Sequence, residues 1–281
     1  MDFPDNPIVD ILTAPRIDPE WLVEDFIVQG DMVCMVGESG AGKSNVAYTI
    51  GLGAASGCAA LGGLVPKGPP KRVLYFDDEN SEANRDEYLR RAWCGLTALN
   101  GKEPDLGLLL QNFWPLGFQL GHDDWPDTLA GWVHYLKPHL VVIDTANACF
   151  NIEDENNNAE AIKAIRRTKQ VMRSIDPKVS SLILKHAKTR TEKGQVRTMR
   201  GAKVWKDQAD SVVFQVKSGG RPRRDGLSAT RLIPDKTRAF GLQRPLYITP
   251  RWTDDRRSGL LLEGSFTPTR DHRKGEDSDD I

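Results

Sequence analysis

The chain has 281 residues, of which 39% are hydrophobic and 27% charged, and its formal net charge is −1. This composition is typical of a globular protein with one large or two small domains. It excludes a mostly disordered chain, a fibrous repeat and a protein that binds polyanions through its overall charge. The four cysteines lie far apart without a CxxC pair, so they suggest neither a zinc site nor a disulfide framework.

The charge is distributed unevenly along the chain. Residues 1–30 carry seven acidic residues and one basic residue, whereas residues 185–224 carry twelve Lys or Arg and three acidic residues, a net charge of +9. The acidic start lacks the layout of a signal peptide, and the uncharged stretch 45–66 is rich in Gly, Ala and Ser although it is long enough to span a bilayer. We therefore expect a cytoplasmic protein that does not engage a membrane.

Apolar runs alternate with helical patterns over the first two thirds of the chain. The runs predict strands at 32–36, 72–76, 140–143 and 181–184, and a further strand with a loop within 106–119. Helices are predicted directly after residue 44 and at 81–96, 124–136 and 159–175. Continuously apolar strands separated by helices are typical of a mostly parallel sheet with helices on both faces.

The pattern changes after residue 210 to short strands separated by turns. These strands are predicted at 211–217, 229–233, 246–249 and 260–263, and we expect them to extend the same sheet in antiparallel fashion. The sequence thus predicts an α/β fold with one main domain over residues 21–265. An extended lead-in over residues 1–20 and a disordered acidic tail over residues 266–281 flank it.

The segment from Gly37 to Ser44 matches the complete P-loop pattern, after a predicted strand and before a predicted helix. Its glycines allow backbone N–H groups to surround a phosphate, and the helix N-terminus adds partial positive charge. We expect Lys43 to contact the terminal phosphates and the Ser44 hydroxyl to hold Mg²⁺. ATP and Mg²⁺ are therefore the predicted cofactors, and the predicted nucleotide-binding residues are Gly37, Glu38, Ser39, Gly40, Ala41, Gly42, Lys43, Ser44 and Asn45.

An acidic residue ends each of two predicted strands. Asp144 has the placement of a Walker B carboxylate that orients the Mg²⁺ shell. Thr145 follows it where many P-loop ATPases carry a catalytic glutamate, so the base must come from elsewhere. Glu79 is the candidate, because the carboxyl ends of parallel strands converge on the ligand crevice. Asp77 and Asp78 compete for the role; alternation places Asp77 on the side of Glu79 and Asp78 on the other.

This order of parts resembles the RecA-like ATPases, and more narrowly the RepA/DnaB-type replicative helicase family, with KaiC-like ATPases as cousins. The resemblance extends over about residues 21–249. Besides the P-loop, it is carried by the sequences at 21–24 (WLVE), 73–81 (VLYFDDENS), 153–158 (EDENNN), 182–186 (LILKH), 200–202 (RGA), 209–210 (AD) and 236–238 (KTR).

The resemblance implies a RecA-like fold, Glu79 as the base and His186 as a sensor of the γ-phosphate. RepA-like proteins often carry paired histidines at that strand end, and here the first position is Lys185. The relatives form rings in which a neighbouring subunit places a cationic side chain at the transferring phosphoryl group. Arg200 and the Lys236–Arg238 pair both match that role, and we favour Arg238 with Lys236 beside it. A homo-oligomer, specifically a hexameric ring, is therefore expected.

A basic segment follows His186 and would face the ring centre if subunits pack as in the relatives. Its side chains would contact nucleic-acid phosphates, and the absence of aromatic residues between 185 and 203 favours backbone tracking over base stacking. The predicted contacts are Lys188, Arg190, Lys193 and Arg197. The predicted function is a ring ATPase and helicase acting on single-stranded DNA. The alternatives are a RecA- or KaiC-like mediator or regulator that does not unwind DNA, and a small-molecule kinase, which would leave the basic segment unexplained.

Overall fold

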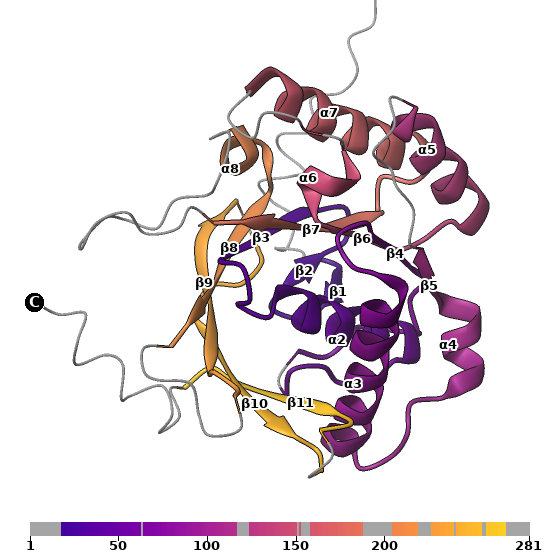
Figure 1. Cartoon of the computed structure of the whole chain (residues 1–281). Helices are drawn as coiled ribbons and strands as arrows, with labels where there is room; N and C mark the ends of the chain where they lie inside the picture. The colour runs from indigo at the N-terminus through magenta and orange to yellow at the C-terminus, as the bar shows by residue number, and fades with distance from the viewer. Residues whose placement is uncertain are drawn as a thin grey trace, which may run out of the picture.

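Figure 1 shows a computed structural model of the chain, which describes residues 18–62, 64–116, 124–150, 152, 158–187, 204–218, 226–238, 240–254 and 257–267. Within these residues, nine strands form one sheet with the order β11-β10-β9-β8-β3-β7-β6-β4-β5. The six strands from β8 to β5 in this order are parallel, whereas β9, β10 and β11 are antiparallel. The predicted α/β fold with an antiparallel extension is confirmed.

The parallel strands are β3 (Met32–Gly37), β4 (Val73–Asp77), β5 (Phe113–Leu116), β6 (Leu140–Asp144), β7 (Ser180–His186) and β8 (Ser211–Lys217). The extension consists of β9 (Thr230–Thr237), β10 (Leu246–Trp252) and β11 (Leu260–Ser265). A separate two-stranded sheet pairs β1 (Trp21–Val23) with β2 (Ile27–Val28).

Helices cover both faces of the parallel part of the sheet (Figure 1). One face carries α2 (Lys43–Ser56), α3 (Glu82–Asn100) and α4 (Leu106–Asn112). The other carries α5 (Trp125–Leu136), α6 (Ala146–Cys149), α7 (Asn158–Ile175) and α8 (Val204–Gln208). Successive strand residues alternate between two cores: Met35 packs on the side of α2, and Cys34 and Val36 pack on the side of α5.

The predicted strand and loop at 106–119 are partly wrong, because residues 106–112 form α4 and only Phe113–Leu116 form a strand. Asp105 begins the helix by accepting a hydrogen bond from the N–H of Leu108 (3.0 Å). Only Leu109 of α4 is buried, while Leu106 and Leu110 are exposed. A run of leucines that continues across the exposed face conceals helical periodicity. Among the helices described here, none has the length and apolarity required to cross a membrane.

An ionic cluster fixes the end of β3 that lies away from the P-loop. The Asp210 carboxylate accepts hydrogen bonds from the N–H of Met32 (3.0 Å) and from Lys169 Nζ (3.2 Å), and it lies 3.3 Å from Arg238 Nη1. Burial, and next the charge of Asp210, raises the pKa of the neighbouring Asp31 to about 6. Asp31 is therefore ionised at neutral pH, and its ionisation lowers the free energy of unfolding.

Replacing Asp31 with asparagine is expected to raise the free energy of unfolding at neutral pH by about 1 kcal/mol, after allowance for solvent screening at this half-buried site. The raised pKa means that the folded state prefers the protonated carboxyl group, so this residue costs stability as the pH rises from 3.8 through about 6. Thermal unfolding of Asp31→Asn and the parent protein should thus differ at neutral pH and converge below the ordinary pKa of aspartate. A variant less stable than the parent at neutral pH would contradict this assignment.

Candidate functional site

The P-loop joins β3 to α2 and has the backbone that phosphate binding requires. Gly40 (φ 69°) and Gly42 (φ 87°) adopt left-handed conformations, which glycine enters without steric cost, and Gly42 is the N-cap of α2. Lys43 is buried, and its Nζ donates to the carbonyls of Gly37 (3.0 Å) and Glu38 (3.2 Å). Burial lowers the pKa of Lys43, and the charges of Asp144 and Glu79 oppose that shift. The Lys43 side chain therefore lies against the P-loop, whose bound phosphates it would contact.

Gln215 of β8 supports the P-loop from the neighbouring strand, and the sequence analysis missed it. It is the register neighbour of Gly37 and is buried, and its Nε2 donates to the carbonyl of Ala41 (2.8 Å). A Cβ on Gly37 would lie 2.8 Å from the carbonyl oxygen of Gln215, so only glycine fits there. No sequence signal marks Gln215, since its role depends on the pairing of β3 with β8.

The Asp144 carboxylate is buried at the end of β6, next to Asp77 at the end of β4. Its Oδ2 accepts a hydrogen bond from the Tyr75 hydroxyl (3.0 Å), and the Ser44 hydroxyl also hydrogen-bonds to this carboxylate. Burial, and then the charge of Asp77, raises the pKa of Asp144 to about 7, while the bonds from Ser44 and Tyr75 oppose the rise. A nearby cation would favour the ionised form and reverse this shift.

The residues around Asp144 fit the predicted Mg²⁺. Among the described residues, Asp144 Oδ1 is buried with no hydrogen-bond partner. An unpartnered carboxylate oxygen beside a serine hydroxyl is the oxygen donor set that Mg²⁺ prefers, with phosphate and water oxygens completing its shell. The described residues contain no group of three His, Cys, Asp or Glu that could hold a metal by itself. Asp144 and Ser44 would thus hold the ion only together with a bound nucleotide.

Asp77 is fully engaged within the protein. Its carboxylate accepts hydrogen bonds from the Tyr48 hydroxyl (2.8 Å), the Asn80 N–H (3.0 Å) and Asn80 Nδ2 (2.9 Å). The Tyr48 and Tyr75 rings stack with centroids 4.1 Å apart, so the two tyrosines hold the two aspartates side by side. These tyrosines were not foreseen from the sequence. The buried contacts of Asp77 leave Glu79 as the acid that faces the other catalytic candidates.

Glu79 and His186 lie together at the carboxyl ends of β4 and β7. Glu79 Oε1 is 3.3 Å from His186 Nε2, and the Thr145 hydroxyl also hydrogen-bonds to the Glu79 carboxylate. The hydrogen bond from His186 lowers the pKa of Glu79, against the opposing effect of burial. The carboxylate is therefore ionised and able to accept a proton, and the structure brings it together with Lys43, Asp144 and His186.

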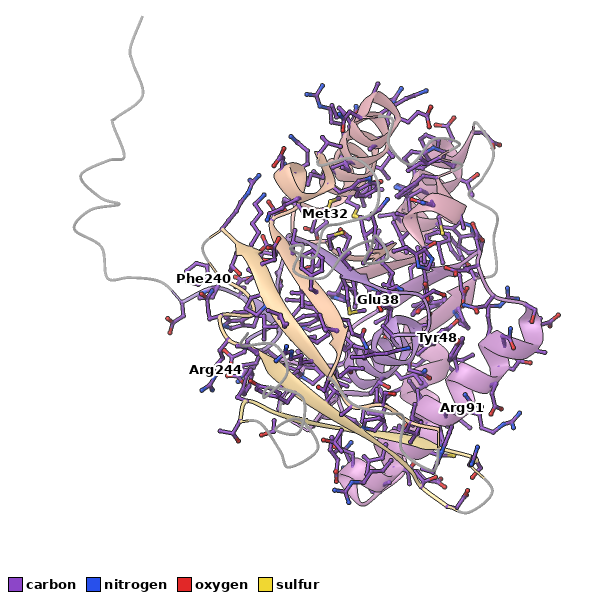
Figure 2. All side chains as sticks on the ribbon, turned by 60° about the vertical axis from the view of Figure 1, so that its left-hand side comes forward. Met32, Glu38, Tyr48, Arg91, Phe240 and Arg244 are labelled. Atoms are coloured by element: carbon purple, nitrogen blue, oxygen red, sulfur yellow. The ribbon has the colours of Figure 1, made fainter. Side chains whose placement is uncertain are left out.

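Lys236 and Arg238 lie far from the P-loop of their own chain. Lys236 pairs with Val212, whereas Gln215 at the P-loop pairs with Leu232 further along the same two strands. Figure 2 places Met32, at the Asp210 end of β3, well away from Glu38, at the P-loop end. Lys236 Nζ donates to the carbonyls that end α8, those of Lys206 (2.8 Å), Asp207 (2.8 Å) and Ala209 (2.7 Å).

Arg238 keeps more of its side chain in solvent, with an exposed fraction of 56%, and its ion pair with Asp210 is 3.3 Å long. Of the two cations, Lys236 is thus committed to α8 and Arg238 is accessible. The other predicted cationic residues lie outside the described residues, and their roles stay predictions: Lys188, Arg190, Lys193, Arg197 and Arg200.

A cavity of about 240 Å³ adjoins the P-loop on the side of the antiparallel strands. Its walls comprise the P-loop glycines and apolar side chains from β10 and β11, including Ile248, Leu260 and Leu262. Lys217 also lines it, and a Cβ on Gly40 would lie 3.8 Å from the Lys217 Nζ. The space thus has both apolar and polar walls, with the Lys217 cation near the P-loop. No local sequence pattern indicates this cavity, because its walls are distant in the chain.

The comparisons with known proteins agree with this fold. A family model described as an AAA domain matches residues 2–192. The structure is similar to the crystal structure of a KaiC-like protein, PH0186, from the hyperthermophilic archaeon Pyrococcus horikoshii OT3, with a TM-score of 0.54 and 12% sequence identity. The match covers 86% of this chain and 94% of the other. No curated protein matches the sequence. The chain therefore belongs to the AAA_25 family of AAA domains, and its fold is that of a KaiC-like, RecA-type P-loop ATPase.

Proposed function

We propose that the protein is a ring-forming ATP-hydrolysing motor that acts on single-stranded DNA, specifically a hexameric replicative helicase of the RepA type. The observation that carries the proposal is the ionised Glu79 carboxylate, held by His186 beside Lys43 and the buried Asp144. This set supplies a phosphate cradle, a metal ligand and a proton acceptor at one edge of the sheet, which are the requirements of nucleotide hydrolysis.

The chain's own residues have distinct parts in this reaction. The P-loop amides and Lys43 would bind and orient the phosphates, and Ser44 and Asp144 would hold Mg²⁺, which would supply charge neutralisation when bound. Glu79 accepts the proton of the attacking water, because its lowered pKa keeps it ionised. His186 contacts Glu79 at 3.3 Å and so orients it, and a γ-phosphate that accepted a hydrogen bond from the same Nε2 would loosen this contact.

A neighbouring subunit completes the site. Arg238 lies at the opposite end of the strands from its own P-loop and is exposed, which is consistent with a role at the P-loop of another copy of the chain. A guanidinium at the transferring phosphoryl group stabilises the charge that develops there. A site that uses an arginine from a second copy favours the ring ATPase over a small-molecule kinase that acts as a monomer.

A mediator or regulator that hydrolyses ATP without unwinding DNA is the second candidate. The similarity in fold to a KaiC-like protein supports this second candidate by analogy. Both candidates share the nucleotide site and differ in what the ring does to a duplex.

Glu79→Gln is expected to lower the hydrolysis rate at least about 100-fold while leaving ATP affinity within about threefold, because the amide cannot accept the proton. Lys43→Ala should lose both binding and hydrolysis. Steady-state ATPase assays and equilibrium binding of a fluorescent ATP analogue measure the two effects. The exposed Glu82→Gln is the matched control, and a Glu79→Gln protein that keeps more than a tenth of the parent rate would exclude Glu79 as the base.

Single-stranded DNA is expected to raise the ATPase rate severalfold at low salt, with the effect fading as salt increases, because phosphate contacts release counterions. A forked duplex should be unwound in the same buffer. Stimulation with an intact fork would select the mediator over the helicase. If DNA neither stimulates hydrolysis nor binds at low salt, both DNA-directed candidates fail.

Mixing experiments test the contribution of Arg238 across subunits. Arg238→Ala and Lys43→Ala should each be inactive alone, and mixed rings should recover activity, since some interfaces then combine an intact P-loop with an intact Arg238. Arg251→Ala, which removes another exposed arginine, serves as the control and should remain active. Absence of recovery in rings shown to contain both variants would argue against this role.

A further inference from the structure

Lys185 is a buried cation one residue before His186. Only 1% of its surface is exposed. Ile183, two residues earlier on β7, belongs to the core on the side of α5 and α7. His186 and Lys185 therefore point to opposite faces of the sheet. Burying an ammonium group is costly unless polar partners offset the loss of water. The contacts that Lys185 makes thus identify what it holds together.

One contact joins Lys185 to the turn that carries Asp144. Lys185 Nζ donates to Asn147 Oδ1 at 2.8 Å. Asn147 lies in α6, whose first turn is closed by the hydrogen bond from the N–H of Cys149 to the carbonyl of Thr145 (3.0 Å). Because Thr145 also bonds to Glu79, a displacement of this turn by bound nucleotide would move Asn147 and the ammonium bonded to it.

A second contact joins Lys185 to α8. Its Nζ lies 4.6 Å from the centroid of the Trp205 ring, and Trp205 is itself buried and stacked on Phe150, with centroids 6.2 Å apart. A cation is attracted more strongly to the face of an indole ring when both are shielded from water. Since a hydrogen bond is directional, the position of Asn147 fixes where the ammonium lies over the ring.

The far end of α8 is held by Lys236, which donates to the carbonyls of Lys206 and Asp207 in the helix and of Ala209 just after it, and Arg238 follows two residues later. A continuous set of contacts thus runs from the Asp144–Thr145 turn through Lys185 and α8 to Lys236 on β9, two residues before the exposed Arg238.

We propose that Lys185 is a positioning residue that couples the state of the Asp144–Thr145 turn to α8 and, through Lys236, to Arg238. Nucleotide binding in one subunit then adjusts the arginine that this subunit presents to its neighbour. The coupling as far as α8 requires only a nucleotide site, whereas its effect on the neighbour rests on the proposed function.

Hydrogen exchange of the full-length protein, with and without Mg²⁺ and ADP–beryllium fluoride, tests the coupling. In the parent protein we expect the nucleotide to slow exchange at the P-loop and to change the exchange of residues 204–208 by about fivefold or more, the range of ordinary coupling free energies. Lys185→Met keeps the side-chain volume without the charge and should lose the response of α8 but not that of the P-loop. Lys185→Arg should keep both responses.

Two further variants keep the test decisive. Asn147→Leu removes the other partner of the hydrogen bond and should reproduce Lys185→Met, even if that variant folds poorly. Lys163→Met removes an exposed lysine of α7 and should behave as the parent. A response of α8 that survives in both Lys185→Met and Asn147→Leu would overturn the proposal, as would a parent α8 that ignores nucleotide while the P-loop responds. Loss of the P-loop response in the parent would instead refute the nucleotide site itself, and the coupling with it.

Discussion

The buried carboxylate of Asp144 is the group on which the rest of the site depends. Its pKa of about 7 results first from burial and then from the charge of Asp77 on the paired strand. The Asp144 carboxyl group is therefore only partly ionised at neutral pH. The Tyr75 and Ser44 hydroxyls and an unpartnered oxygen leave it prepared for a cation. The raised pKa of Asp144 means that its ionised form costs stability in the apo protein, and bound Mg²⁺ and nucleotide would relieve that cost.

Around this carboxylate the sheet separates two sets of contacts. On the side of α2, Lys43, Glu79 and His186 form the proposed phosphate site, and Gln215 supports the P-loop from β8. On the opposite side, Lys185 contacts α6 and α8. Alternation along β7 places the adjacent residues Lys185 and His186 on opposite faces of the sheet, so the proposed chemical role of His186 and the proposed coupling role of Lys185 are separated by the sheet.

Much of the fold and the centre of the site follow from the sequence. The P-loop requires glycines at fixed spacing, and strands buried on both faces read as continuous apolar runs, so β3, β4, β6 and β7 could be recognised. Helix α4 could not, because its leucines continue around the exposed face. The roles of Gln215, Tyr48, Tyr75 and the wall of the cavity depend on which strands become neighbours, and no local pattern encodes that.

A structure of the assembled protein with Mg²⁺, ADP and aluminium fluoride tests the central claim most directly. It should place Ser44 and Asp144 at the metal, Glu79 facing the phosphoryl mimic, and a neighbouring subunit's Arg238 at the same group. A nucleotide enclosed by a single chain, with Arg238 in solvent and Glu79 still bound to His186, would contradict the account.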